Sequence, residues 1–323
     1  KFYFLKKILI TGSAGFIGFN LSKYLLQNSN YHIIGIDNLN DYYDVNLKKK
    51  RIKNLRSFKR FKFQKADITN QFTMNKIFKK NKFDFVFNLA AQAGVRYSID
   101  HPRKYIDANI LGFFNIIDCC KKYHIKRLFY ASSSSVYGES KKFPLKESEN
   151  ISPKNIYGLS KKINEEISLI YNQFYNLRLT GLRFFTVYGE WGRPDMMMLK
   201  FIDCYFKKKI FRLHNFGKHT RDFTHINDVV EILHRLIINN KKLKKNDVLN
   251  ICSNKPINLL NVISFMMKNG IKPKISKVKL QQADILKTHG DNRKLFKYVG
   301  TQKFNNWKSS IKNLIIWYKK HMQ

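Results

Sequence analysis

Lys7-Ile-Leu-Ile-Thr-Gly-Ser-Ala-Gly-Phe-Ile-Gly18 is the stretch that decides the fold. Its first five residues are a short apolar run, which predicts a buried strand of a parallel sheet. An amphipathic segment over 19–27 follows and predicts a helix. Between them, Gly12 permits a tight turn, Gly15 lets the backbone approach a pyrophosphate, and Gly18 lets the helix pack closely on the strand. The stretch therefore predicts a dinucleotide-binding turn, against the alternative of a purely structural turn.

A second predicted strand, 31–37, ends in an acidic residue, Asp37. Asp37 lies 19 residues beyond Gly18, where a carboxylate accepts hydrogen bonds from the adenosine ribose hydroxyls in such folds. The same carboxylate would repel a 2′-phosphate. This position therefore favours NAD over NADP as the cofactor.

Strands and helices alternate along the first half of the chain. The segments 61–66, 83–89 and 127–131 have the apolar character of further strands, and 105–124 has the apolar stripe of a helix. This alternation predicts an α/β fold with a doubly wound parallel sheet. The small residues at 90–94 directly follow a strand, which suits either a backbone lying against a cofactor or a plain strand-to-helix turn.

A tyrosine and a lysine stand four residues apart in Tyr157-Gly-Leu-Ser-Lys161 and would face the same side of a helix. An unperturbed phenol has a pKa of about 10, and a nearby ammonium lowers that pKa by favouring the phenolate. The pair could then take a proton from a substrate hydroxyl. A lysine-rich chain contains this spacing by chance, so its context matters. Ser132-Ser-Ser-Ser135 ends a predicted strand, where open α/β sheets bind ligands.

The chain is strongly basic, with 61 Lys and Arg against 22 Asp and Glu in 323 residues and a net charge of +39. The basic residues are spread along predicted helices and turns, and Lys, Asn, Ile, Phe and Tyr are abundant throughout. We interpret the charge as compositional drift and predict no nucleic-acid partner, because charge alone does not define a binding site. Anionic substrates would still be attracted.

The four cysteines show neither a disulfide framework nor metal-ligand spacing. We therefore predict no metal site and a reducing, cytoplasmic location. No apolar run is long enough to span a bilayer, which predicts no membrane partner. The first residues lack the apolar core and the cleavage site of a secretory signal.

The ordered motifs resemble the extended short-chain dehydrogenase/reductases, and among them the NAD-dependent nucleotide-sugar epimerase/dehydratase family. They are Thr11-Gly-x-x-Gly-x-x-Gly18, Leu89-Ala-Ala91, Ser132-Ser-Ser and Tyr157-x-x-x-Lys161. The similarity is greatest to the UDP-glucuronate 4-epimerases of that family. The segments that carry it are Asp37-Asn-Leu-Asn-Asp-Tyr-Tyr-Asp44, Gln92-Ala-Gly-Val-Arg-Tyr97, Gly181-Leu-Arg-Phe-Phe-Thr-Val-Tyr-Gly189 and Trp191-Gly-Arg-Pro-Asp-Met196.

The resemblance implies NAD-dependent 4-epimerisation of UDP-glucuronate to UDP-galacturonate through a 4-keto intermediate. Tyr157 would remove the proton of the sugar 4-hydroxyl and Ser133 would hydrogen-bond that oxygen. Lys161 would hold the nicotinamide ribose and keep the phenol acidic. The residues that the resemblance assigns to cofactor binding are Gly12, Gly15, Phe16, Ile17, Gly18, Asp37, Asn38, Asp67, Ile68, Leu89, Ala90, Ala91, Asn109, Ser132, Tyr157 and Lys161.

A second set of residues would bind the UDP-sugar. Arg193 could clamp the sugar carboxylate in a bidentate pair, with hydroxyl donors beside it. Arg221 resembles the arginine that holds the diphosphate. The residues assigned to substrate binding are Arg96, Ser134, Ser135, Thr186, Arg193, Arg221, Gln281 and Asp284.

The chain departs from the family pattern at four positions in three segments. Glu190 replaces a usual proline and would place an acid near the substrate carboxylate. Asn155 replaces a small hydroxyl residue before Tyr157. Gln282 and Ala283 replace Pro-Gly before Asp284.

We expect 1–182 with 223–252 to form the NAD-binding domain, and 183–222 with 253–323 the smaller nucleotide-sugar lobe. In similar proteins, helices equivalent to 105–124 and 153–176 pair across a two-fold axis, so a homodimer is expected. Two alternatives remain open. One is a related enzyme on another nucleotide sugar, such as a UDP-glucose epimerase, a decarboxylase or a dehydratase, and the other is a non-enzymatic NAD-binding protein.

Overall fold

The computed structural model describes residues 6–281 and 284–322. A seven-stranded parallel sheet in the order β10-β6-β5-β4-β1-β2-β3 lies at its centre. The strands are β1 (Lys7–Thr11), β2 (His32–Asp37), β3 (Phe61–Lys65), β4 (Phe85–Asn88), β5 (Arg127–Ser133), β6 (Leu179–Phe184) and β10 (Asn246–Ile251). The strand order reverses at β1, which lies between β2 and β4, and open α/β sheets bind ligands at such a point.

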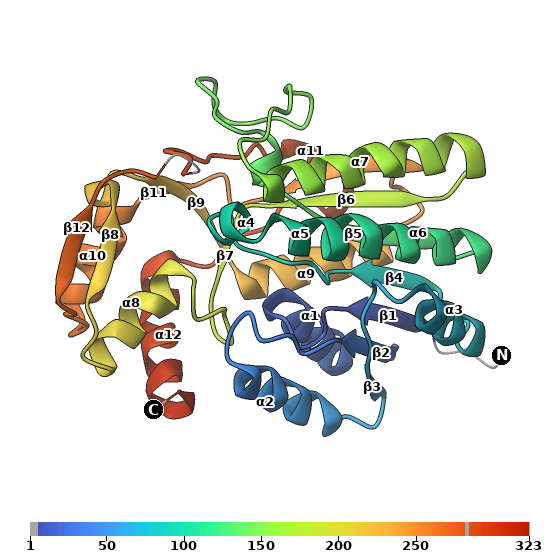
Figure 1. The fold of residues 1–323 in the computed structure, drawn as a ribbon, viewed down its shortest axis with the longest axis horizontal. Coiled ribbons are helices and arrows are strands. Elements are labelled where there is room, and N and C mark those ends of the chain that lie inside the picture. The colour runs from blue at the N-terminus through green and yellow to red at the C-terminus, as the bar shows by residue number, and fades with distance from the viewer. Residues whose placement is uncertain (1–5, 282–283, 323) are drawn as a thin grey trace.

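Helices cover both faces of this sheet (Figure 1). One face carries α1 (Phe16–Asn28), α2 (Val45–Arg56), α9 (Ile226–Ile238) and α11 (Arg293–Val299), and the other carries α3 (Gln71–Lys80), α6 (Gly112–Lys122) and α7 (Ile156–Tyr175). Within β1, Ile8 and Ile10 belong to the first core and Leu9 to the second, because successive strand residues point to opposite faces. The predicted doubly wound parallel sheet is confirmed.

The predicted single helix over 105–124 is wrong in detail. The chain forms α5 (Pro102–Tyr105), then a π-helical segment η1 (Ile106–Leu111), and only then α6. The wider η1 turn brings the buried Asn109 amide onto Gln92, where it accepts from the backbone N–H at 2.7 Å and donates to the carbonyl at 3.1 Å. A periodicity of 3.6 residues carries no information about such an insertion.

The remaining elements form a smaller lobe beside the carboxyl ends of the central strands, because β7 begins two residues after β6 ends (Figure 1). One small sheet joins β7 (Thr186–Tyr188), β9 (Thr220–His225) and β11 (Pro256–Asn258), and a second joins β8 (Phe211–His214) to β12 (Ile275–Val278). The helices α8 (Met197–Phe206), α10 (Leu259–Lys268) and α12 (Trp307–His321) share a separate apolar core with these strands. The short helices are α4 (Tyr97–Asp100), η2 (Ser134–Val136) and η3 (Asn215–Gly217).

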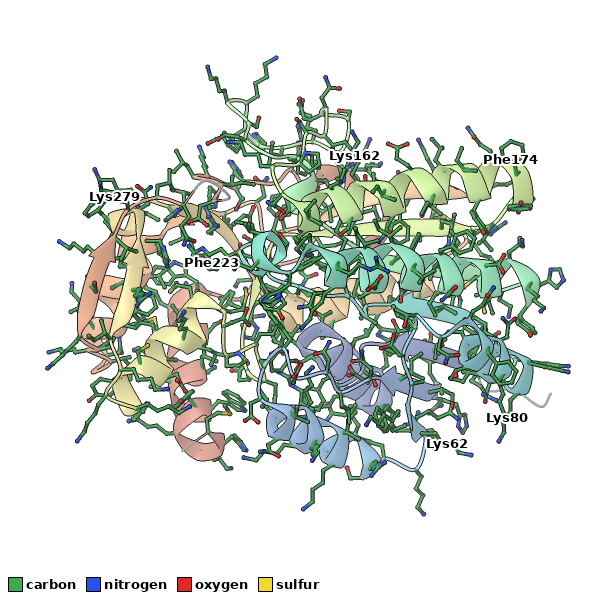
Figure 2. All side chains as sticks on the ribbon, in the orientation of Figure 1. Lys62, Lys80, Lys162, Phe174, Phe223 and Lys279 are labelled. Atoms are coloured by element: carbon green, nitrogen blue, oxygen red, sulfur yellow. The ribbon has the colours of Figure 1, made fainter. Side chains whose placement is uncertain are left out.

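Basic side chains project from several sides of the molecule. Figure 2 shows Lys62, Lys80 and Lys279 at different edges of the ribbon. This dispersion agrees with the interpretation of the charge as a property of the whole composition. In the part of the chain that the structure describes, no helix has the length and apolar character needed to cross a membrane.

Candidate active site

A cavity of about 430 Å³ opens at the carboxyl ends of the central strands, against the smaller lobe. Most of the predicted site residues line it, although they come from segments far apart in the sequence. The predicted residues on its wall are Gly12, Gly15, Phe16, Ile17, Gly18, Asp37, Asn38, Asp67, Ile68, Leu89, Ala90, Ala91, Ser132, Ser133, Ser134, Ser135, Tyr157, Lys161, Thr186, Arg193, Arg221 and Asp284.

The glycine-rich turn forms one end of the cavity and fits a dinucleotide. Gly12 has a φ of +67°, and a Cβ there would lie 2.8 Å from the backbone nitrogen of Ala90. A Cβ on Gly18 would lie 2.2 Å from the carbonyl oxygen of Gly12, so the helix could not approach the turn. The N-cap of α1 is Gly15, which has no side chain to cap the first turn. The N–H groups of that turn are therefore left for an anionic ligand.

Asp37 ends β2 at the cavity wall, as the sequence predicted. Its carboxylate accepts hydrogen bonds from the backbone N–H groups of Leu39 (2.8 Å) and Ala14 (3.1 Å). Burial raises the pKa of Asp37, and these hydrogen bonds together with the charge of Lys48 oppose the rise. The carboxylate is thus tied to the glycine-rich turn through Ala14.

Asn38 and Asp67 extend this end of the cavity. The Asn38 amide donates to Asp67 at 2.8 Å. Burial works to raise the pKa of Asp67, but hydrogen bonds from Asn38 and Thr69 hold it below its ordinary value. The two residues form one polar edge between the ends of β2 and β3.

Tyr157, Ser133 and Lys161 meet at the middle of the cavity. Tyr157 and Ser133 both line the cavity, and Lys161 Nζ lies 6.0 Å from the centroid of the Tyr157 ring. Burial raises the pKa of Tyr157, and the neighbouring Ser133 hydroxyl and the positive charge of Arg193 oppose the rise. Burial also lowers the pKa of Lys161 to about 8. Ser133 and Arg193 are the groups that lower the pKa of Tyr157 in this structure, and the role of Lys161 in keeping the phenol acidic stays a prediction.

Arg193 enters the cavity from the segment between β7 and α8. Its guanidinium forms a two-point ion pair with Asp195, with Nε–Oδ1 at 3.0 Å and Nη2–Oδ2 at 2.5 Å. The hydroxyl of Tyr42 donates to the same carboxylate at 3.1 Å. The sequence analysis assigned no role to Tyr42 or Asp195, although both lie in the motifs that carry the family resemblance. Tyr42 and Asp195 are 153 residues apart, so no local sequence pattern predicts the hydrogen bond between them.

The serine loop after β5 has two kinds of contact. Ser132 donates to Glu165 at 2.5 Å, and Glu165 is ion-paired with the buried Arg183. Its hydroxyl is therefore engaged inside the fold, although Ser132 also borders the cavity. Ser134 and Ser135 lie on the wall in η2, which Ser133 caps by accepting from the Ser135 N–H at 3.1 Å.

Three predicted residues do not line the cavity. Asn109 is buried and bonded to Gln92 and Ser160, so it supports the wall from behind. Arg96 forms an ion pair of 2.8 Å with Asp284, which itself borders the cavity. Gln281 is exposed.

Arg221 borders the cavity but its guanidinium is already bonded. It donates to the carbonyl oxygens of Thr220 (3.0 Å), Leu286 (3.1 Å) and Ile285 (2.6 Å). Burial lowers the pKa of Arg221 to about 10. Its remaining N–H groups are the ones that could meet an anionic ligand.

The departures from the family pattern have local explanations. Glu190 does not line the cavity and lies 3.3 Å from His225 on β9, so the expectation of an acid beside the substrate carboxylate is wrong. Asn155 is the N-cap of α7 and accepts from the Gly158 N–H at 2.9 Å. Gln282 and Ala283 lie outside the described residues.

A model of the NAD dependent epimerase/dehydratase family matches residues 8–252. The chain is 40% identical over 329 residues to protein CapI of Staphylococcus aureus, covering 97% of this chain and 98% of that protein. It is 35% identical over 320 residues to the UDP-glucuronate 4-epimerase of Thermodesulfobacterium geofontis, covering 98% and 97%. Among solved structures, a Bacillus cereus UDP-glucuronic acid 4-epimerase in complex with UDP-glucuronic acid and NAD superposes with a TM-score of 0.90. That protein shares 30% identity, covering 97% of this chain and 99% of its own.

Proposed function

Since the chain belongs to the NAD dependent epimerase/dehydratase family, we propose that it is the isomerase that converts UDP-glucuronate to UDP-galacturonate through a 4-keto sugar. The observation that carries the proposal is the presence in one cavity of both the Ser133–Tyr157 pair and the guanidinium of Arg193. The pair suits proton transfer at a sugar hydroxyl, and the guanidinium suits a sugar carboxylate. Relatives named as UDP-glucuronate 4-epimerases support the same substrate.

The family is NAD dependent, and the wall of the cavity fits that cofactor. When bound, NAD would supply the hydride acceptor for sugar carbon 4 and the hydride donor to its other face. The N–H groups at the start of α1 would hold the pyrophosphate, the Asp37 carboxylate would accept from the adenosine ribose, and the Lys161 ammonium would hold the nicotinamide ribose. All of these groups belong to residues that line the cavity.

Tyr157 would take the proton of the 4-hydroxyl and return it after the sugar has turned. Because burial raises its pKa, the free phenol keeps its proton near neutrality, and Ser133 and Arg193 are the groups that favour its loss. Ser133 can accept or donate, so it can hydrogen-bond the sugar oxygen at both stages of the transfer.

Arg193 would hold the sugar carboxylate while carbon 4 is a ketone. A β-keto acid loses CO₂ when the breaking bond overlaps the carbonyl π system, so a carboxylate held in the carbonyl plane is protected. A planar guanidinium suits this task because it fixes a carboxylate in its own plane. Thr186, Ser134 and Ser135 line the same cavity and supply hydroxyl donors.

The Arg193–Asp195 ion pair favours one competing function, a UDP-glucose-type epimerase. The Asp195 carboxylate already neutralises the charge of the Arg193 guanidinium, so a neutral sugar would leave no unpaired charge in the cavity at this point. Incubation of the purified chain with NAD and either UDP-glucuronate or UDP-glucose, followed by NMR identification of the products, separates the two. We expect UDP-galacturonate, and no product from Tyr157→Phe. Conversion of UDP-glucose alone would overturn the proposal, and release of CO₂ would identify a decarboxylase.

We also propose a homodimer. Exposed apolar side chains gather on the neighbouring helices η1, α6 and α7, and Figure 2 shows Phe174 projecting from the end of α7. These side chains are Ile106, Leu111, Phe114, Leu159, Ile170 and Phe174. Burying them against a second copy would remove an apolar surface from water.

We also propose which segments bind which ligand and that the protein acts in the cytoplasm. The segments 1–182 and 223–252 would bind NAD, and 183–222 and 253–323 would bind the nucleotide sugar. All four cysteines are free and buried, which suits the reducing conditions of the cytoplasm.

A further inference from the structure

Arg51 is a fully buried arginine beside the cavity. From α2, its Nη1 donates to the carbonyl oxygen of Ala14 and to the hydroxyl of Tyr43, each at 2.7 Å. Its Nη2 donates to the carbonyl oxygens of Trp191 at 2.5 Å and Gly192 at 3.0 Å. One guanidinium thus connects the glycine-rich turn, the loop after β2 and the segment that leads into the cavity from β7.

The partners of this buried cation are neutral. All four hydrogen bonds go to carbonyl or hydroxyl oxygens, and the negative charge of Asp37 acts on Arg51 only through space. A buried charge with only neutral partners is costly, but methionine in its place would leave the carbonyl oxygens of Ala14, Trp191 and Gly192 without this donor and so lower the stability. An apolar side chain could not hold three segments at fixed separations.

The two ends of this connection lie next to functional groups. On one side, the Ala14 carbonyl accepts from Arg51 while its N–H donates to Asp37 at 3.1 Å. On the other side, Gly192 directly precedes Arg193 in the chain. Trp191 has a φ of +59°, which is strained for a residue with a side chain and needs support from its surroundings.

We infer that Arg51 is a positioning residue that makes the glycine-rich turn and the Arg193 segment one rigid unit, so that cofactor binding and sugar-carboxylate binding reinforce each other through it. The identity of the two ligands rests on the proposed function. Arg51 itself touches neither ligand, since its side chain is fully buried behind the wall. Its effect on the sugar must therefore pass through Arg193.

Arg127 offers a matched control. It is also fully buried and also braces neutral oxygens, donating to Thr180 Oγ1 and the Lys244 carbonyl, each at 2.9 Å. It lies at the start of β5, at the opposite end of the strands from the cavity. Arg127→Met should lower the melting temperature as Arg51→Met does, without any effect specific to ligands.

The test is a double-mutant cycle on the full chain stripped of copurified nucleotide, with the Kd of UDP-glucuronate measured before and after saturation with NAD. In the wild type, NAD should tighten UDP-glucuronate binding. Arg51→Met should weaken UDP-glucuronate binding on the order of tenfold and abolish this enhancement, but should have little further effect in an Arg193→Ala background. Arg51→Lys keeps the charge without the planar fork, so it should restore much of the melting temperature but not the enhancement.

Two outcomes would overturn the inference. One is that Arg51→Met lowers the melting temperature but leaves the enhancement intact, as expected of Arg127→Met. The other is that the effects of Arg51→Met and Arg193→Ala simply add. Because binding is measured and not turnover, a wild type that binds UDP-glucuronate without converting it would contradict the proposed function while still deciding the role of Arg51.

Discussion

Arg193 and Asp195 face each other in a two-point ion pair at the cavity wall, only two residues apart in the chain. The guanidinium that would recognise a sugar carboxylate therefore carries a carboxylate of its own. A substrate carboxylate must share Arg193 with Asp195 or displace it. Under the proposed function, the selectivity between acidic and neutral sugars would depend on this competition.

Arg193→Ala should lower activity on UDP-glucuronate by one to two orders of magnitude. A hydrogen bond to a charged group contributes roughly 1.5–3 kcal/mol, and about 1.4 kcal/mol corresponds to tenfold. Activity on UDP-glucose should fall much less, and the NAD content should not change. The measurement is kcat/KM for both sugars. Equal losses on both sugars would show that Arg193 is structural or binds the UDP part.

Asp195→Asn should increase the preference for the acidic sugar. Without the Asp195 charge, Arg193 remains in the cavity with its positive charge uncompensated, so a negatively charged ligand binds more tightly. We expect the Kd of UDP-glucuronate to fall severalfold relative to that of UDP-glucose, as measured by calorimetry. A parallel loss of affinity for both sugars would mean that Asp195 acts mainly by orienting Arg193.

Lys161→Met should stabilise the ligand-free protein at neutral pH. Burial lowers the pKa of Lys161 from 10.5 to about 8, so below pH 8 the charged form costs about 3 kcal/mol of folding free energy. Between pH 8 and 10.5 the unfolded chain binds more protons than the folded one, and the stability of the wild type rises with pH.

The check is urea unfolding of the wild type and Lys161→Met from pH 7 to 10.5. The difference in the free energy of unfolding between Lys161→Met and the wild type should shrink as the pH rises through this range. The variant should also be catalytically impaired. Lys162→Met, at the next position of α7, is the control and should show no such convergence. A constant difference at all pH values would contradict a buried, charged Lys161.

NAD should copurify with the chain and be released on denaturation. Asp37→Asn should weaken NAD binding and raise the tolerance for NADP, because the charge that repels a 2′-phosphate is gone. Asp67→Asn is a control at the same end of the cavity and should leave the NAD/NADP preference intact. Chromatography of the released nucleotide distinguishes NAD from NADP, and NADP from the wild type would overturn the role of Asp37.

Ile170→Glu should convert the proposed homodimer to a monomer. Ile170 is 49% exposed on α7, and burying a carboxylate in a paired apolar surface is costly. Ile238→Glu changes a residue that is 61% exposed at the end of α9 and should leave the dimer intact. Light scattering at micromolar concentration is the measurement, and a monomeric wild type would count against the interface.

Local sequence determined the parts of this protein that depend on neighbouring residues. The apolar run before Gly12 forms β1, the glycines form the turn, and the apolar run before Asp37 forms β2. Tyr157 and Lys161 share a side of α7 because they are four residues apart. These placements follow from helix and strand geometry, so a reading of the chain could predict them.

Tertiary structure alone decided which side chains meet across the cavity and how their charges are set. Arg51 joins Ala14, 37 residues away, to Trp191, 140 residues away, and Arg96 reaches Asp284 over 188 residues. No periodicity encodes such partners, since they depend on how the smaller lobe packs against the sheet. The same packing half-buries Tyr157 and buries Lys161, and the loss of solvent shifts the pKa of each toward its neutral form, whereas their spacing alone had predicted an acidic phenol.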